Sequence, residues 1–313
     1  MPDKRTPRRV YALLGFMVFV WSINFIVAKT ALKEFPPLLL GALRFSLAGV
    51  IITPVYLMRP RKPIARGELW KLLGIGIVGV GINQLAFLLG LIRTSVGHAA
   101  ILICLTPVFT LLLSSYAGHE KITRYKLAGL ILAISGVGVL QGGNIFTGHG
   151  NPLGDLFIVV SSFTFAFFAV SGKTIREHTS GLTINTVAYL GSTVILSPVT
   201  FFLAKDFNFA GVSATGWICV LFIAVFPSLI AYLIYYHALH YMPATRISML
   251  AYLQPVIATS FAIPILGEKV TSSLLIGGAL VLAGVAAANA GAKKDGHPEA
   301  SVADPEGQEA LTQ

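Results

Sequence analysis

The chain has 313 residues, of which 55% are apolar and only 12% charged, and its formal net charge is +10. Soluble domains usually carry about 25% charged residues, so this composition excludes an ordinary soluble globular protein. The basic residues lie in short connections between apolar segments and form no single patch, which favours membrane orientation over nucleic-acid binding as the reason for the charge.

Apolar segments of about 20 residues, the length that an α-helix needs to cross a bilayer, recur along almost the whole chain. The first segment is too long for a signal peptide and has no small-residue cleavage site, so it is predicted to be a membrane helix. Ten transmembrane helices are expected, at residues 10–32, 37–58, 69–91, 95–117, 124–142, 153–175, 182–204, 213–240, 244–266 and 271–291. The fold class expected is therefore an all-α membrane protein.

The tails and connections carry most of the charge. A basic tail at 1–9 begins the chain, and a polar tail at 292–313 is expected to be disordered because it cannot bury enough apolar area to fold. With the first tail in the cytoplasm, most lysines and arginines fall in cytoplasmic segments, and the outer segments hold only Lys29, Lys33, Arg93, Lys205 and Lys269. This bias predicts an inner (plasma) membrane protein with both termini in the cytoplasm.

The second half of the chain repeats the first. A shift of 148 positions places Pro107 on Pro255 and aligns two sets of glycines, Gly129, Gly136 and Gly143 with Gly277, Gly284 and Gly291. Earlier in each half, a shift of 144 places Lys29 on Lys173 and Pro54 on Pro198. Two five-helix repeats are therefore expected, at 10–143 and 153–291. Because each holds an odd number of helices, the second enters the membrane from the opposite side, an arrangement typical of secondary transporters.

Several short motifs give the chain a family resemblance. They are Trp21-Ser22-x-Asn24, Arg44-Phe45, Leu105-x-Pro107 before Glu120-Lys121-x-Thr123, and Leu253-x-Pro255 before Gly267-Glu268-Lys269-x-Thr271. With these motifs the chain resembles the drug/metabolite transporter superfamily, in its EamA-type branch with two tandem five-helix domains. The resemblance covers about Val10 to Gly291, and His119 departs from the glycine at the matching position of the second copy.

The resemblance implies a ten-helix transporter with a central cavity that exports amino acids, drugs or other metabolites. Relatives also carry nucleotide sugars and sugar phosphates, so the fold does not specify the substrate.

Polar groups inside hydrocarbon are costly, so those near the predicted midplane mark a candidate substrate pathway. The residues predicted to bind substrate are Trp21, Asn24, Arg44, Asn83, Gln84, Tyr189, Tyr232 and Gln254. The helices at 124–142 and 271–291 have almost nothing polar at that depth and carry the glycine stripes, which allow close packing. These two helices are predicted to brace the cavity from outside.

Arg44 and three tyrosines each leave two interpretations open. Arg44 either attracts an anion or acts as a gate in the cavity, or its long stem carries the charge out to the headgroups. Tyr232, Tyr235 and Tyr236 can stack on a flat substrate, although the latter two equally suit an interfacial or lipid-facing position. Tyr232 is favoured for the cavity because it is deeper and aligns with Gln84 in the repeat.

Four residues are candidates for gates or hinges. Pro107 and Pro255 each remove a backbone donor in mid-helix, which suits either a gate or plain packing. His98 and Arg246 occupy equivalent repeat positions at helix starts, where the alternatives are a gate and an interfacial anchor. Separately, Glu120 and Glu268 each precede a threonine by three residues, and a structural role at the cap of the next helix is expected for both.

The function predicted is secondary transport of a small organic metabolite by alternating access, with the solute and the lipid bilayer as the partners. No ATP-binding loop, cofactor motif or metal-ligand spacing is present in the sequence, so neither cofactor nor metal is expected and the chain is predicted not to be an enzyme. One alternative is a membrane-embedded lipid-processing enzyme, for which the acids are too scattered. Another is a sensor or assembly protein without transport. Oligomeric state, direction and proton coupling stay open.

Overall fold

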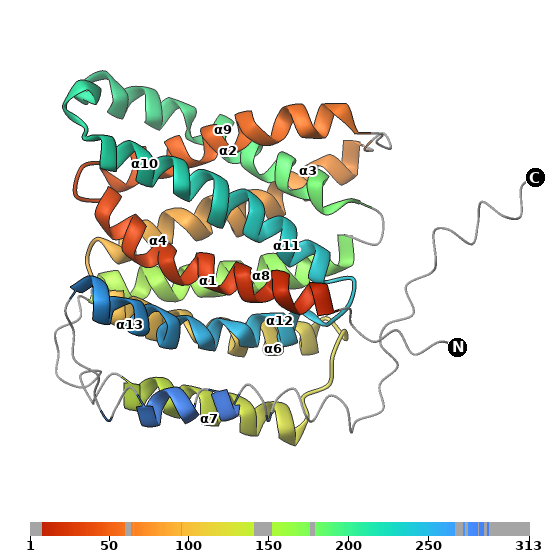
Figure 1. Ribbon diagram of the computed structural model, residues 1–313. Coiled ribbons are helices and arrows are strands. Elements are labelled where there is room, and N and C mark those ends of the chain that lie inside the picture. Colours follow the sequence, from red (N-terminus) through yellow and green to blue (C-terminus); the bar gives the residue numbers. More distant parts are fainter. Residues whose placement is uncertain are drawn as a thin grey trace, which may run out of the picture.

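The computed structural model describes residues 8–59, 64, 66–94, 96–140, 152–175, 179–266 and short pieces at 272, 275–280, 282–284 and 287. The secondary structure elements in these residues are all helical, and long helices lie side by side through the molecule (Figure 1). The predicted disordered tail at 292–313 and the Glu268-to-Thr271 motif fall outside the described residues.

The first half of the chain forms five helical spans. They are α1 (Arg8–Ala31), α2 (Pro37–Met58), α3 (Arg66–Gly76) continued by η1 (Ile77–Ile82) and α4 (Asn83–Leu91), α5 (Val96–Ile103) with α6 (Thr106–Tyr116), and α7 (Arg124–Leu140). The helix starts at Arg8, so the last part of the expected tail at 1–9 is helical.

The second half follows the same plan. Its elements are α8 (Pro152–Ile175), α9 (Gly181–Lys205), the short connection η3 (Phe209–Gly211), α10 (Ala214–Ile223) continued by η4 (Ala224–Ile230) and α11 (Ala231–Ala238), and α12 (Ala244–Ser248) followed by η5 (Met249–Tyr252) and α13 (Leu253–Leu266). Short helical pieces between 275 and 284 lie within the tenth expected span.

Five of the described helices are long and apolar enough to cross a membrane. They are Arg8–Ala31, Pro37–Met58, Arg66–Leu91, Pro152–Gly172 and Ala214–Ala238. A helix of this length spans the hydrocarbon core of a bilayer and satisfies its own backbone polar groups there. The chain is therefore a helical membrane protein.

The third span of each half contains a π-helix at the matching place. η1 covers Ile77–Ile82 and η4 covers Ala224–Ile230. In η4, Pro227 has no N–H to donate, and the hydroxyl of the next residue, Ser228, donates to the carbonyl of Ile223 at 2.7 Å. The Ser228 side chain thus adds a hydrogen bond to the helix beside the proline.

The fourth span of each half is interrupted next to its proline. α5 ends at Ile103, and Pro107 lies in the first turn of α6, where a missing backbone N–H is tolerated. In the second half, the 3₁₀ turn η5 separates α12 from α13, and Pro255 lies in the first turn of α13. In both spans the regular α-helix is therefore interrupted at an equivalent position, next to the proline.

The two halves meet through equivalent residues. The rings of Trp21 and Phe165, which a shift of 144 relates, have centroids 5.5 Å apart. Gln84 Nε2 and the hydroxyl of Tyr232, 148 positions apart, are separated by 3.4 Å. Contacts between residues that correspond in a repeat arise where two copies face each other around a common centre.

The connections pair in the same reciprocal manner. Glu34, between α1 and α2, accepts hydrogen bonds from the backbone and hydroxyl of Ser213, just before α10, both at 2.7 Å. Thr179, between α8 and α9, donates its hydroxyl to Glu68 at the start of α3. Each contact joins the first connection of one half to the second connection of the other.

Helix α7 lies at the edge of the molecule, at the bottom of Figure 1, on the opposite side from α2 and α9. It is closely approached by the described part of the last span: a Cβ on Gly284 would lie 2.6 Å from the backbone nitrogen of Ala133. Only glycine permits this distance. The contact agrees with the role expected for the glycine stripe at this position.

Candidate functional site

A cavity of about 100 Å³ lies between the two halves. Residues of α1, α2, α4, α5 and α6 line it from the first half, and residues of α8, α11, α12, η5 and α13 line it from the second. Among the described residues, none of α7 lines it. The cavity therefore has walls from both repeats.

Most residues predicted to bind substrate border this cavity. Seven of them line it, namely Trp21, Asn24, Arg44, Asn83, Gln84, Tyr232 and Gln254. Tyr189 stands directly behind, where its hydroxyl lies 3.5 Å from Gln84 Nε2 and donates to the carbonyl of Ser228 at 2.7 Å. The structure thus brings the eight residues together, and their role in binding stays a prediction.

Arg44 is buried in the middle of the protein. Its side chain is 3% exposed, and its Nε donates to the hydroxyl of Ser228 at 2.6 Å. The alternative in which the stem carries the charge out to the headgroups is therefore wrong. Within the described residues no aspartate or glutamate forms an ion pair with Arg44, although a buried charge ordinarily requires a partner.

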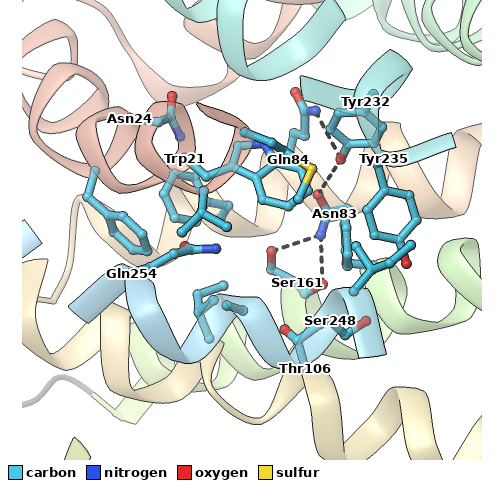
Figure 2. Close-up of a pocket in the computed structure, with 18 of the residues that line it drawn as sticks. Trp21, Asn24, Asn83, Gln84, Thr106, Ser161, Tyr232, Tyr235, Ser248 and Gln254 are labelled. Carbon is cyan, nitrogen blue, oxygen red and sulfur yellow. Dashed lines mark hydrogen bonds between the residues drawn. The ribbon is translucent and has the colours of Figure 1, made fainter. Parts of the chain in front are cut away.

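Two polar residues at the start of α4, Asn83 and Gln84, contact polar side chains of the second half. Asn83 Nδ2 donates to the carbonyl of Ser161 at 2.7 Å and lies 3.0 Å from its hydroxyl (Figure 2). The hydroxyl of Tyr232 lies 3.5 Å from Asn83 Oδ1 and 3.4 Å from Gln84 Nε2. These contacts link α4 to α8 and α11 across the boundary between the repeats.

Aromatic side chains form another part of the cavity lining. The indole N–H of Trp21 donates to the carbonyl of Pro227 at 3.2 Å, which holds the ring in place. Its centroid lies 5.5 Å from that of Phe165 and 6.1 Å from that of Tyr232, both nearly perpendicular. Edge-to-face packing of this kind stabilises aromatic clusters and fixes the orientation of their rings.

Two buried polar atoms at the cavity have no hydrogen-bond partner among the described residues. They are Asn24 Oδ1 and Gln84 Oε1. Most buried polar atoms in proteins are hydrogen-bonded. These atoms are therefore available to a solute.

Four polar residues of the lining were not among the predicted binding residues, namely Thr106, Ser161, Tyr235 and Ser248. Tyr235 lines the cavity and, like Tyr236, is only 1% exposed, so the lipid-facing alternative is wrong for both tyrosines. Thr106 and Ser161 were identifiable as polar residues near the midplane. Ser248 follows from helical spacing, because it lies three residues before Ala251, which also lines the cavity.

Three of the four candidate gating residues, Pro107, Arg246 and Pro255, do not line the cavity in the described part of the chain. Pro107 and Pro255 each directly follow a lining residue, Thr106 and Gln254 respectively. Arg246 donates to the hydroxyl of Tyr11 at 3.2 Å near the surface. The side chain of His98 falls outside the described part of the structure. Gating by these four residues stays a prediction.

Glu120 connects the halves at the other end of α12. Its carboxylate lies 2.8 Å from Lys126 Nζ and accepts from the hydroxyl of Thr245 at 2.9 Å. The expected cap of α7 is present in Thr123, whose hydroxyl oxygen accepts from the backbone of Lys126 at 3.4 Å. Glu120 therefore contributes a contact between repeats in addition to its place before the helix.

Two further charged residues stabilise the ends of spans. Lys29 donates to the carbonyls of Leu91 and Thr94, the latter at 2.9 Å, and so satisfies carbonyls at the C-terminal end of α4. The two hydrogen bonds from Ser213 hold the pKa of Glu34 below its ordinary value, since they stabilise the charged carboxylate. Among the described residues, no three His, Cys, Asp or Glu side chains are grouped to bind a metal.

Comparison with known proteins gives a consistent result. The model of the EamA-like transporter family matches residues 9–141 and 152–290, one match in each half. An "Uncharacterized transporter" of Archaeoglobus fulgidus is 26% identical over 88% of this chain and 96% of its own length. A "Probable amino-acid metabolite efflux pump" of Salmonella typhimurium is 28% identical over 86% of this chain and 91% of its own.

Two more comparisons extend this result. The "Uncharacterized inner membrane transporter YedA" of Escherichia coli is 26% identical over 84% of both chains. A crystal structure of another protein superposes with a TM-score of 0.73 at 19% identity and covers 93% of this chain and 100% of that one. At that identity the superposition shows a shared fold.

Proposed function

Because this chain belongs to the EamA-like transporter family, we propose that it moves a small organic metabolite through the central cavity by alternating access. The family and the names of the relatives identify a membrane transporter. The proposal adds the route and the mechanism. In this mechanism the two repeats rock around a binding site between them, so that the site faces each side of the membrane in turn.

The complete architecture proposed is ten transmembrane helices in two inverted repeats, with both termini in the cytoplasm of an inner-membrane protein. The contact between Glu34 and Ser213 supports it, since it brings the first connection of one repeat to the second connection of the other. Repeats that entered the membrane from the same side would hold these connections on opposite faces. The excess of basic residues in the predicted cytoplasmic segments supports the orientation.

The observation that carries the transport proposal is the composition of the cavity wall. Buried polar side chains from both repeats converge there beside an aromatic cluster, in a protein whose surface faces lipid. Polar groups at such depth are expensive unless they serve a pathway. We assign substrate contacts to the seven lining residues predicted from sequence, with Tyr189 supporting them from behind.

The energy source in this proposal is a solute gradient. None of the described lining residues is an aspartate, glutamate or histidine, so this part of the cavity wall offers no ordinary carboxylate or imidazole site for a coupled proton. Facilitated efflux and exchange require no such group. Export of amino acids, drugs or related metabolites is the solute range that the efflux-pump names of the relatives favour.

Flux into liposomes tests the proposal. Purified protein would be reconstituted and assayed with a panel of radiolabelled amino acids and other metabolites, with and without a pH gradient. Gln84→Ala should lower the flux of a carried solute roughly threefold to tenfold, since each hydrogen bond lost is worth about 0.5–1.5 kcal/mol. Val194→Ala, at a position 69% exposed on α9, is the control and should leave flux unchanged.

The same assay contains the result that would reject the proposal. If Gln84→Ala and Trp21→Ala both inserted normally and transported as fast as the parent protein, the cavity would not be the route. A protein that carried none of the solutes under either condition would point to the sensor or assembly alternative.

A further inference from the structure

Arg44 gives the cavity a positive charge. Of the described residues that line it, Arg44 alone carries a formal charge. Only its Nε has a hydrogen-bond partner within the described residues, the hydroxyl of Ser228. The two terminal nitrogens of the guanidinium group have no such partner and are therefore free to bind a ligand in the cavity.

We infer that the transported solute is an organic monoanion whose carboxylate binds the guanidinium group of Arg44. This inference rests on the proposed transport function and narrows it. A guanidinium group presents parallel N–H donors that match the two oxygens of a carboxylate, and such charge-assisted pairs are stronger than neutral hydrogen bonds. A monoanion also makes the occupied cavity neutral.

Charge balance separates the monoanion from other solutes. A zwitterion such as a neutral amino acid would leave the cavity with one uncompensated positive charge, and a cation would leave it with two. A phosphate dianion would exceed the single positive charge that the lining offers. In a buried site of low dielectric, an unpaired charge is strongly disfavoured.

The other cavity atoms define the rest of the solute. Asn24 Oδ1 and Gln84 Oε1 are buried acceptors without a partner among the described residues, so they favour a solute that donates a hydrogen bond. Trp21, Phe165 and Tyr232 offer apolar ring surface beside these acceptors. The solute class is thus a hydroxy acid or N-acylated acid with an apolar body.

An ammonium group would also satisfy the two acceptors, and the experiment must separate it from a hydroxyl. Two matched series serve this purpose: phenyllactate, phenylalanine and phenylethylamine, and 2-hydroxyisocaproate, leucine and isoamylamine. Within a series the body is the same, and the members are an anion, a zwitterion and a cation near pH 7. Flux into liposomes containing the full-length protein would be measured for each, with subtraction of protein-free liposomes.

The hydroxy acid should be carried about tenfold faster than its amino acid and amine in at least one series, because only the monoanion pairs with Arg44 and leaves no uncompensated charge in the cavity. Arg44→Gln should remove that preference, and Val194→Ala should keep it. Flux of the amino acid or amine equal to or above that of the hydroxy acid would overturn the inference while supporting transport. Absence of flux for all six solutes would count against both proposals.

A second variant and the parent protein keep the inference testable if Arg44→Gln does not fold. Ser228→Ala removes the only described partner of Arg44 Nε and leaves the charge in place, so it should retain the anion preference. If the Arg44→Gln protein cannot be purified, the comparison of the six solutes on the parent protein still decides the inference.

Discussion

Gly79 provides a sharp test of how the two halves pack. It lies in the π-helix η1, against α8, and a Cβ at this position would lie 2.2 Å from the Cβ of Phe168. Ordinary carbon contacts are about 3.5–4.0 Å. Because the obstructing atom is fixed to the backbone of α8, a change of rotamer cannot relieve the clash. Gly79→Ala must therefore push the two helices apart.

The expected cost follows from this geometry. Overpacking of a tight core by one methyl group costs about 1–3 kcal/mol and more where the backbone must move. Gly74→Ala is the matched control, because a Cβ on Gly74 meets nothing within 4 Å in the same span. There alanine replaces glycine in a helix without a clash and should stabilise by up to about 1 kcal/mol.

Thermal unfolding in detergent measures the difference. Both cysteines, Cys104 and Cys219, are free and buried, so a thiol-reactive dye reports unfolding as they become exposed. Gly79→Ala should unfold several degrees below the parent protein and Gly74→Ala at or above it. Equal midpoints for the two variants would refute the packing of η1 against α8.

Three further changes test single contacts. Trp21→Phe keeps the aromatic packing but leaves the carbonyl of Pro227 without its donor, and should lower stability by about 1–3 kcal/mol in the same dye assay. Glu34 has a lowered pKa, so its contact with Ser213 contributes stability above the ordinary glutamate pKa of about 4.3 and loses it as pH falls through the lowered value. Glu34→Gln should therefore flatten the acid side of the midpoint-against-pH profile, whereas an unchanged profile would exclude this linkage. Glu120→Ala leaves the buried hydroxyl of Thr245 without its acceptor and removes the ion pair with the half-buried Lys126, and it should cost about 1–3 kcal/mol, with Lys121→Ala as the exposed control.

Hydropathy located the spans because lipid imposes a minimum apolar length on every helix. It could not show which face of a helix meets lipid, since both the lipid-facing and the protein-facing sides are apolar. Tyr235 illustrates this limit: its depth was evident, but its position in the cavity wall depends on how α11 rotates against α1. The rare polar residues were more informative, and Asn83 and Gln84 were found because hydrocarbon offers them no partner.

The repeat also carried more information than individual motifs. Alignment of Gln84 with Tyr232 predicted that they occupy equivalent places, and the structure places their polar atoms 3.4 Å apart. The π-helices were not predicted, because a gain of one residue per turn leaves no signature in composition. Only Pro227 in η4 signals an irregularity there, and η1 contains no proline.

The interruptions within the described spans all lie next to the cavity. η1 precedes Asn83, η4 precedes Tyr232, the break after Ile103 precedes Thr106, and η5 contains Ala251, and each of these four residues lines the cavity. In a membrane, backbone that departs from the α-helix is tolerated only where protein or a polar cavity satisfies it.

Side chains from three other helices supply that compensation at η4. Trp21 binds the carbonyl of Pro227, Tyr189 binds the carbonyl of Ser228, and Arg44 binds the Ser228 hydroxyl. The residues assigned to the solute therefore also hold the irregular backbone in place. A solute that binds the terminal nitrogens of Arg44 would therefore touch the same side chain whose Nε supports η4 through Ser228, which links binding to the geometry of this helix.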